Sequence, residues 1–170
     1  MLAARAPSAG NTQGWHAVVL EGAQTATFWD ITLPAPRRAT FGWPRLLDAP
    51  AIVLPFADAE AYVSRYSEPD KAASGLGGGP DAWPVPYWTI DTAMAVMTLL
   101  LAAEAAGLGA LLFGVFRGER ELRTALGVPD RLELLGAVAL GFPALEGSRP
   151  GRSAGRARRP RDAFVHRGRW

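Results

Sequence analysis

Cysteine is absent from the 170 residues, which excludes disulfide bonds, thiol catalysis and cysteine-ligated metals. The sequence also lacks the G-x-x-x-x-G-K-[ST] loop of nucleotide hydrolases, the H-E-x-x-H zinc motif and the G-x-S-x-G serine elbow. The two histidines, His16 and His166, stand far apart in the chain and fit packing or surface roles better than metal binding. We therefore expect no metal and no catalytic nucleophile, and the missing cysteines favour a cytoplasmic protein.

Acidic residues are scarce near the C-terminus, so the net charge of +2 hides an asymmetry. Residues 1–148 hold ten Lys and Arg against fifteen Asp and Glu, a net charge of −5, whereas residues 149–170 hold eight Arg against one Asp, a net charge of +7. A basic segment of this kind suits a phosphate-bearing partner. Nucleic acid, a phosphate-containing cofactor and a merely solvated tail are the alternatives for it.

Residues 88–116 form the longest weakly charged run, in which Glu104 is the only ionisable residue after Asp91. Ala, Leu and Met dominate its first part, and all three favour helix. Asp91 suits the positive end of a helix dipole, and Gly107 and Gly109 are typical helix stops. The pattern predicts a long buried central helix, a glycine turn and a short strand formed by LLFGVF.

The same run is long enough to cross a membrane. Glycines interrupt it, Glu104 lies near its middle, and no basic residues flank it. We therefore expect a soluble core helix and no membrane partner. A helix that is apolar on nearly all sides needs cover on all sides, and its alanines permit close contact, so a second subunit is expected to supply part of that cover.

The remainder of the chain alternates apolar segments with amphipathic ones. Strands are predicted at residues 16–22, 51–56 and 132–143. Helices are predicted at residues 57–66 and 118–129. Residues 23–44 contain prolines and are expected to be irregular, and the glycine-rich residues 67–86 are expected to form a mobile loop. One domain over residues 1–170, of class α/β or α+β with a single central sheet, is the fold that follows.

Three further segments have the chemistry to bind a ligand. Residues 6–15, APSAGNTQGW, combine small residues with one hydroxyl and two amide side chains, those of Ser8, Asn11 and Gln13. Such groups hydrogen-bond a flat heterocycle or a polyol without adding charge. The glycines of residues 107–114 let backbone N–H groups approach a ligand, and Arg156 and Arg158 can grip one phosphate. Taken singly, these segments are also explained as a helix end with its turn, a packing turn and a solvated tail.

Taken together and in this order, the segments resemble the nitroreductase family of flavoproteins from Ala3 to about His166. APSAGNTQGW is similar to the family's P-S-x-x-N-x-Q-P-W loop, with Gly14 in place of the usual proline. DTAMAVMTLLLAAEAAGLG is similar to its central helix and glycine turn, ELRTALGVPDRLELLGAVALGFP to its L-G-I-P and L-G-Y-P region, and RARRP to its late K-x-R-x-P element.

The resemblance implies an α+β fold with a mixed central sheet flanked by helices, in a homodimer with two FMN sites at the subunit interface. In the family, the first loop contacts the flavin from the second subunit, a strand entrance directs backbone N–H groups at flavin N5 and O4, and two late arginines bind the phosphate. The corresponding positions are Pro7, Ser8, Ala9, Asn11, Leu112, Phe113, Gly114, Arg156 and Arg158.

The resemblance also implies the reaction. The flavin accepts a hydride from NADH or NADPH and reduces a nitroaromatic, a quinone or a similar flat acceptor, so no catalytic side chain is required. Trp83, at the aromatic end of residues 67–86, is predicted to stack on the acceptor.

Two departures from the family pattern stand out. The family begins with a helix and an R-S-x-R strand that also grips the phosphate, so residues 1–170 are expected to form an N-terminally shortened domain with a basic extension at residues 149–170. The asparagine that often faces the flavin from the central helix is absent where Met94 and Met97 lie. A flavin-sequestering or flavin-free relative is therefore the alternative function, and no nucleic-acid partner is expected.

Overall fold

A computed structural model describes residues 2–143, 151 and 153–170 and contains one five-stranded sheet of order β1-β2-β5-β3, with β4 paired to β2 beside this path. The strands are β1 (Trp15–Glu21), β2 (Ala51–Ala57), β3 (Gly109–Phe113), β4 (Glu133–Leu134) and β5 (Ala137–Gly141). Every pairing among the described residues is antiparallel, which corrects the mixed sheet implied by the family resemblance. The reason is that β2 and β3 run in the same direction but β5 lies between them, antiparallel to both.

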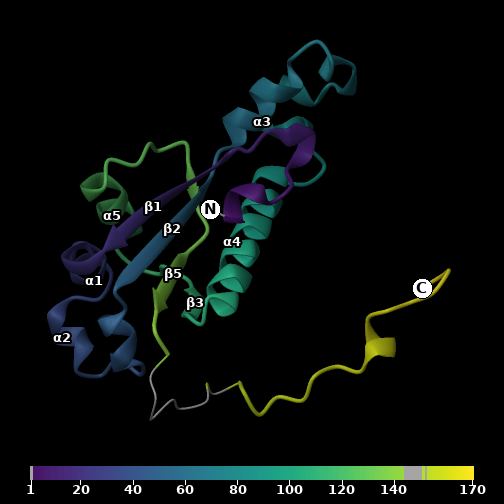
Figure 1. The fold of residues 1–170 in the computed structure, drawn as a ribbon. Coiled ribbons are helices and arrows are strands. Elements are labelled where there is room, and N and C mark those ends of the chain that lie inside the picture. Colours follow the sequence, from purple (N-terminus) through teal and green to yellow (C-terminus); the bar gives the residue numbers. More distant parts are fainter. Residues whose placement is uncertain (1, 144–150, 152) are drawn as a thin grey trace.

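The sheet is covered on both faces, because the side chains of the central strand β2 alternate between them. Ile52, Leu54 and Phe56 pack against α1 (Thr25–Thr32) and α5 (Glu119–Ala125), whereas Val53 packs against α4 (Tyr87–Ala105). Figure 1 shows α1 and α5 on one side of the strands and α4 on the other. The expected α+β class, with helices flanking a central sheet, is therefore confirmed.

Helix α1 corrects the expectation that residues 23–44 are irregular. The 3-10 turn η3 (Gly22–Gln24) leads directly into α1, and a capping box starts this turn: Gln24 Oε1 accepts a hydrogen bond from the Glu21 N–H at 3.1 Å. Phe28 and Trp29 are buried in the core, 1% and 5% exposed. The prolines of this stretch lie beyond the end of α1, where a short second helix, α2 (Ala35–Arg38), follows.

The predicted central helix is present as α4, but it begins four residues before Asp91. It ends where predicted, at a turn in which Gly107 takes a positive φ of 73°. One face packs on the sheet, while a second face is exposed along a stripe of apolar residues that comprises Ile90, Met94, Met97 and Leu101. By length and composition alone α4 is apolar enough to span a membrane. The sequence predicts that α4 is covered on all sides, and a single chain does not provide that cover.

Residues 67–86 are packed rather than a free loop. They form three short 3-10 turns, of which the second and third lie against α3 (Ala59–Tyr66). Trp83 is only 8% exposed, and its indole N–H donates to the Leu76 carbonyl at 3.0 Å. Trp83 therefore anchors residues 67–86, which the glycines had predicted to be mobile.

The segment predicted as one strand at residues 132–143 is split into β4 and β5 around Gly136. Gly136 has a φ of 139°, and a Cβ atom there would lie 2.7 Å from the Phe113 carbonyl oxygen, so only glycine lets β3 pair so closely. Residues 153–170 lie away from the sheet as an exposed basic tail (Figure 1), and Arg149 and Arg152 lie outside the described residues.

Candidate functional site

The segment from Ala6 to Gly14, here called the polar loop, connects the N-terminal 3-10 turn η1 (Leu2–Arg5) to β1. Two of its non-glycine residues, Asn11 and Gln13, have positive φ angles of 53° and 54°. Left-handed backbone is tolerated by asparagine but is unfavourable for most L-residues, and it persists where the surroundings impose it. The polar loop is therefore held in one shape by its contacts.

Hydrogen bonds inside the polar loop fix this shape. Ser8 Oγ accepts from the Gln13 N–H at 2.8 Å, Thr12 Oγ1 donates to the Ala9 carbonyl at 2.5 Å, and the Asn11 N–H donates to the Ser8 carbonyl at 2.9 Å. Within the part of the chain that the structure describes, the Ser8 hydroxyl proton and the Asn11 side-chain NH₂ have no protein acceptor. Two neutral donors therefore remain for a ligand.

Three side chains anchor the polar loop from outside. The Ala9 N–H donates to Asp91 Oδ2 on α4 at 2.7 Å, and the Tyr62 hydroxyl on α3 donates to the same oxygen at 2.8 Å. Arg65 Nε donates to the Gly10 carbonyl at 3.0 Å. Burial, and then the hydrogen bond to Asp91, raises the pKa of Tyr62 far above its ordinary value, so its hydroxyl stays a donor.

Glycine is required at two positions of the polar loop because tyrosine rings occupy the adjacent space. A Cβ atom on Gly14 would lie 2.5 Å from Tyr62 Cε2, and one on Gly10 would lie 2.9 Å from Tyr66 Cε2. Gly14, which stands where the family usually has proline, thus matches a tyrosine pressed against the backbone. Glycine at this position makes room for the Tyr62 ring, and the hydrogen bonds of the polar loop still hold its shape.

The second predicted segment, Leu112 to Gly114, lies at the end of the sheet where β1 begins, because Phe113 pairs with Ala137 and Trp15 pairs with Ala57. Leu112 is 44% exposed. The Phe113 ring belongs to the core and stacks on Trp29 at a centroid distance of 6.0 Å. Phe113 therefore offers a ligand its backbone rather than its ring.

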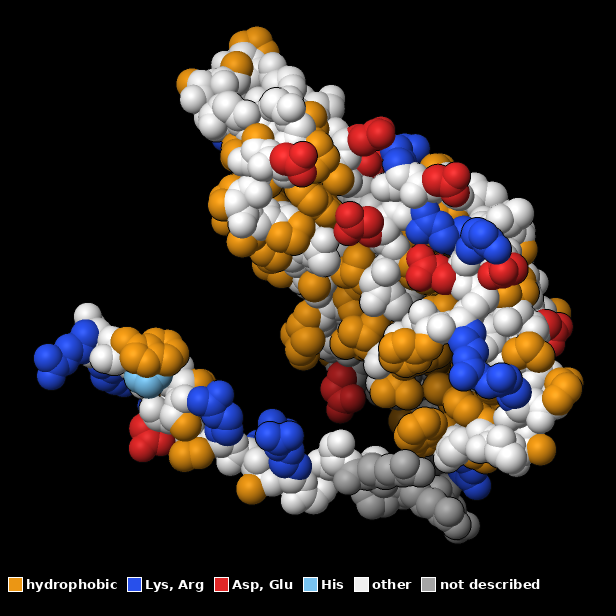
Figure 2. All heavy atoms as spheres, turned by 180° about the vertical axis from the view of Figure 1, so that it is seen from behind, with side chains coloured by type: hydrophobic (Ala, Val, Ile, Leu, Met, Phe, Trp, Pro, Cys, Tyr) orange, Lys and Arg blue, Asp and Glu red, His pale blue; other side chains and the backbone are white. Residues whose placement is uncertain are grey.

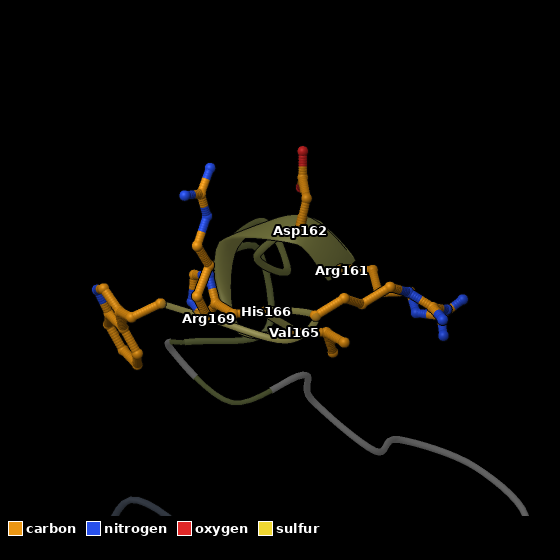
Figure 3. Close-up of a pocket in the computed structure, with 7 residues that line it drawn as sticks. Arg161, Asp162, Val165, His166 and Arg169 are labelled. Carbon is orange, nitrogen blue, oxygen red and sulfur yellow. The ribbon is translucent and has the colours of Figure 1, made fainter.

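The predicted phosphate ligands lie on the basic tail. Arg156 and Arg158 are exposed, and among the described residues neither forms an ion pair. Further along, the tail turns at η8 (Arg161–Ala163), and a hollow there is lined by Arg161, Asp162, Val165, His166 and Arg169, among others. Figure 3 shows these side chains radiating outward from the turn instead of converging. Figure 1 shows the described part of the basic tail lying apart from the body of the chain, so one chain does not bring its arginines to the polar loop.

Trp83 lies in an aromatic cluster with Tyr62, Tyr66 and Trp88, close behind the polar loop. This position is buried, so the predicted stacking of Trp83 on an acceptor has no exposed ring face to use in this conformation. The sequence did not predict that Asp91, Tyr62 and Arg65 contact the polar loop. Asp91 was interpreted as a helix-dipole residue, yet it lies inside α4 and binds the polar loop.

Comparison with known proteins places this geometry in a family. Residues 1–142 match the model of the nitroreductase family. The chain is 32% identical over 163 residues to an NADH dehydrogenase of Thermus thermophilus, with 85% of this chain and 74% of that protein covered. It is 30% identical over 141 residues to a protein of Archaeoglobus fulgidus named as an NADH dehydrogenase/NAD(P)H nitroreductase, with 81% of this chain and 66% of that protein covered, just under two thirds of the relative.

The fold gives the same result. A nitroreductase of Desulfovibrio desulfuricans, solved in complex with FMN, is 25% identical and superposes with a TM-score of 0.62, with 96% of this chain and 77% of that chain covered. The resemblance drawn from the four sequence motifs is thereby confirmed. The chain belongs to the nitroreductase family.

Proposed function

We propose that this chain is an FMN-dependent oxidoreductase that uses NADH or NADPH to reduce a small flat acceptor such as a nitroaromatic compound or a quinone. Family membership supports the proposal, as do the names of the two relatives and the FMN complex of the Desulfovibrio structure. The observation in this chain that carries it is the polar loop, whose shape is fixed by hydrogen bonds to Asp91 and within the loop, and whose Ser8 and Asn11 donors have no acceptor among the described residues.

The donors of the polar loop fit a flavin. The Ser8 hydroxyl and the Asn11 amide are neutral, and such groups suit the carbonyl and ring-nitrogen atoms of a heterocycle or the hydroxyls of a ribityl chain. FMN supplies the hydride-accepting chemistry when bound, so the protein contributes position and electrostatics. At the other segment, the backbone from Leu112 to Gly114 is the group that we expect to face the ring system.

The phosphate is the part of FMN that needs charge. Arg156 and Arg158 are exposed and without ion-pair partners among the described residues, so both are free to take a phosphate. Losing one charge-assisted hydrogen-bond donor costs about 1.5–3 kcal/mol, or roughly one to two decades of affinity. Arg158→Ala should weaken FMN binding by that factor and leave riboflavin, which has no phosphate, nearly unaffected.

Arg167→Ala is the matched control, because it removes the same charge from the same tail outside the R-A-R-R-P element. The dissociation constants of both flavins are measured by flavin fluorescence for the two variants. Equal weakening of FMN and riboflavin by Arg158→Ala, or equal weakening of FMN by both variants, would show that Arg158 does not bind the phosphate.

We propose that a second copy of the chain completes the site. The stripe on α4 comprises Ile90, Met94, Met97 and Leu101, which are between 36% and 58% exposed. Leu112 in β3 and Phe116 beyond it add exposed apolar surface. Figure 2 shows hydrophobic side chains along the side of the body that faces the tail. A contiguous apolar surface of this kind is typical of a subunit interface, and the family resemblance predicts a homodimer there.

We propose that residues 67–86 shape the choice of acceptor while Trp83 holds them in place. The aromatic cluster gives the segment a rigid base, while Val85 within the segment and Tyr87 directly after it are 42% and 38% exposed. The flavin-sequestering alternative differs in one respect, because a sequestering protein binds flavin without accepting electrons from NADH or NADPH.

A further inference from the structure

Asp91 is a buried carboxylate, 3% exposed, in the interior of α4. Burying a carboxylate is costly unless hydrogen bonds replace the lost water. Its Oδ2 atom accepts two such bonds, from the Ala9 N–H at 2.7 Å and from the Tyr62 hydroxyl at 2.8 Å. The two donors belong to different elements, the polar loop and α3, so one carboxylate joins three parts of the chain.

The polar loop depends on such a joint. Asn11 and Gln13 both have left-handed backbone, which is unfavourable for a glutamine, and Ser8, whose hydroxyl remains free to donate, directly precedes the bonded Ala9. Without an acceptor, the Ala9 N–H would be left unpaired beside the aromatic cluster, and the loop would exchange its strained shape for others. The apparent affinity for a ligand falls in proportion to the fraction of loops that keep the binding shape.

We propose that Asp91 is a positioning residue that holds the polar loop in its cofactor-binding conformation, with Tyr62 fixing the carboxylate in turn. The proposal rests on the proposed binding of FMN by this loop. A carboxylate suits the task because both of its oxygens are hydrogen-bond acceptors, so either orientation of the group places an acceptor near the two donors. An amide places an oxygen there in only one of its two orientations.

Four variants separate positioning from general stability: Asp91→Ala, Asp91→Asn, Tyr62→Phe and the double variant Asp91→Ala/Tyr62→Phe. Asp91→Ala should weaken FMN binding by roughly tenfold to a hundredfold, the effect of losing a hydrogen bond to a charged group. It should also lower the Tm, because the buried Tyr62 hydroxyl loses its acceptor. Asp91→Asn should lie between this variant and the wild type in both respects.

The double variant decides the issue. Removing the unpaired hydroxyl with Tyr62→Phe should recover part of the Tm lost in Asp91→Ala, while FMN affinity stays low because the Ala9 N–H still lacks its acceptor. Recovery of the affinity together with the Tm would overturn the proposal, as would unchanged affinity in Asp91→Ala. Asp91→Asn carries the same comparison if Asp91→Ala does not fold.

Amide hydrogen exchange of the flavin-free protein gives a second readout that does not involve FMN. Exchange at Ala9 and its neighbours in the polar loop should accelerate in Asp91→Ala, while the amides of β2 stay protected. If exchange accelerates equally throughout the chain, or does not accelerate in the polar loop, Asp91 does not position the loop. If the wild-type chain binds no FMN, the proposed function fails on that result alone, and the exchange data still decide whether Asp91 holds the loop.

Discussion

If the proposed homodimer forms through the exposed face of α4, a charge placed on that face should separate its two subunits without unfolding either one. Met97 lies in the middle of the apolar stripe and is 51% exposed. Full burial of a methionine is worth about 1.5–3 kcal/mol, so covering the exposed half contributes about 1 kcal/mol per chain and about 2 kcal/mol per symmetric dimer. Met97→Lys loses this and also forces an ammonium group into an apolar interface, at several kcal/mol for each ion.

Together these effects exceed about 5 kcal/mol, which is more than roughly a thousandfold in the dimer dissociation constant. Light scattering after size exclusion at micromolar concentration should show a dimer for the wild type and a monomer for Met97→Lys. Ala125→Lys is the control, because Ala125 is exposed on α5, which covers the opposite face of the sheet. A wild-type monomer, or a Met97→Lys variant that stays dimeric, would refute the reasoning.

The position of the charge matters in this experiment. Ala95 also lies on α4, but it is 1% exposed and belongs to the core of its own chain. An arginine there would bury an unpaired charge inside the monomer and unfold it. Circular dichroism should therefore show native helix content for Met97→Lys and its loss for Ala95→Arg.

Two further predictions concern Tyr62. Because the native pKa of Tyr62 lies above its unfolded value near 10, the native state keeps the proton that the unfolded state releases, so stability is complete below about pH 10 and falls above it by up to about 1.4 kcal/mol per pH unit. Urea titrations at increasing pH should show this loss in the wild type and a smaller one in Tyr62→Phe; parallel pH profiles would contradict it. Gly14→Ala should cost about 1–3 kcal/mol because its Cβ would lie 2.5 Å from Tyr62 Cε2, whereas Gly42→Ala, with open space around it, should change the Tm little. Equal Tm values for the two glycine variants would show that the ring moves aside freely.

The elements that the sequence predicted well carry their own local signal. The continuous apolar run of β2 and the alanine-rich, glycine-terminated α4 are specified by periodicity and by stop residues. Helix α1 was missed because prolines just beyond it suggested an irregular segment, while the turn η3 that leads into it is capped through a Gln24 contact that composition does not reveal. The antiparallel sheet was also missed, because strand order is set by contacts between distant residues.

The candidate site divides in the same way. The sequence singles out Ser8, Asn11 and the tail arginines because their residue types fit a cofactor and follow a family motif, and their contact with FMN stays a prediction. Asp91 was misread, because its bond to Ala9 joins residues 82 positions apart and leaves no trace in either neighbourhood. Trp83 was predicted to stack on an acceptor, since a loop full of glycine gives no sign that one indole would be packed against four other rings.

The central claim, that this chain binds FMN and passes electrons from NADH or NADPH to an acceptor, is tested most directly by an anaerobic spectroscopic titration. The purified chain is saturated with FMN and freed of excess flavin, and NADH or NADPH is then added while the visible flavin absorption is followed. The account predicts one FMN per chain, bleaching by at least one of the two reductants, and return of the absorption on adding a quinone. Retained flavin that neither NADH nor NADPH bleaches would favour a flavin-sequestering protein, and absence of retained flavin would contradict the account.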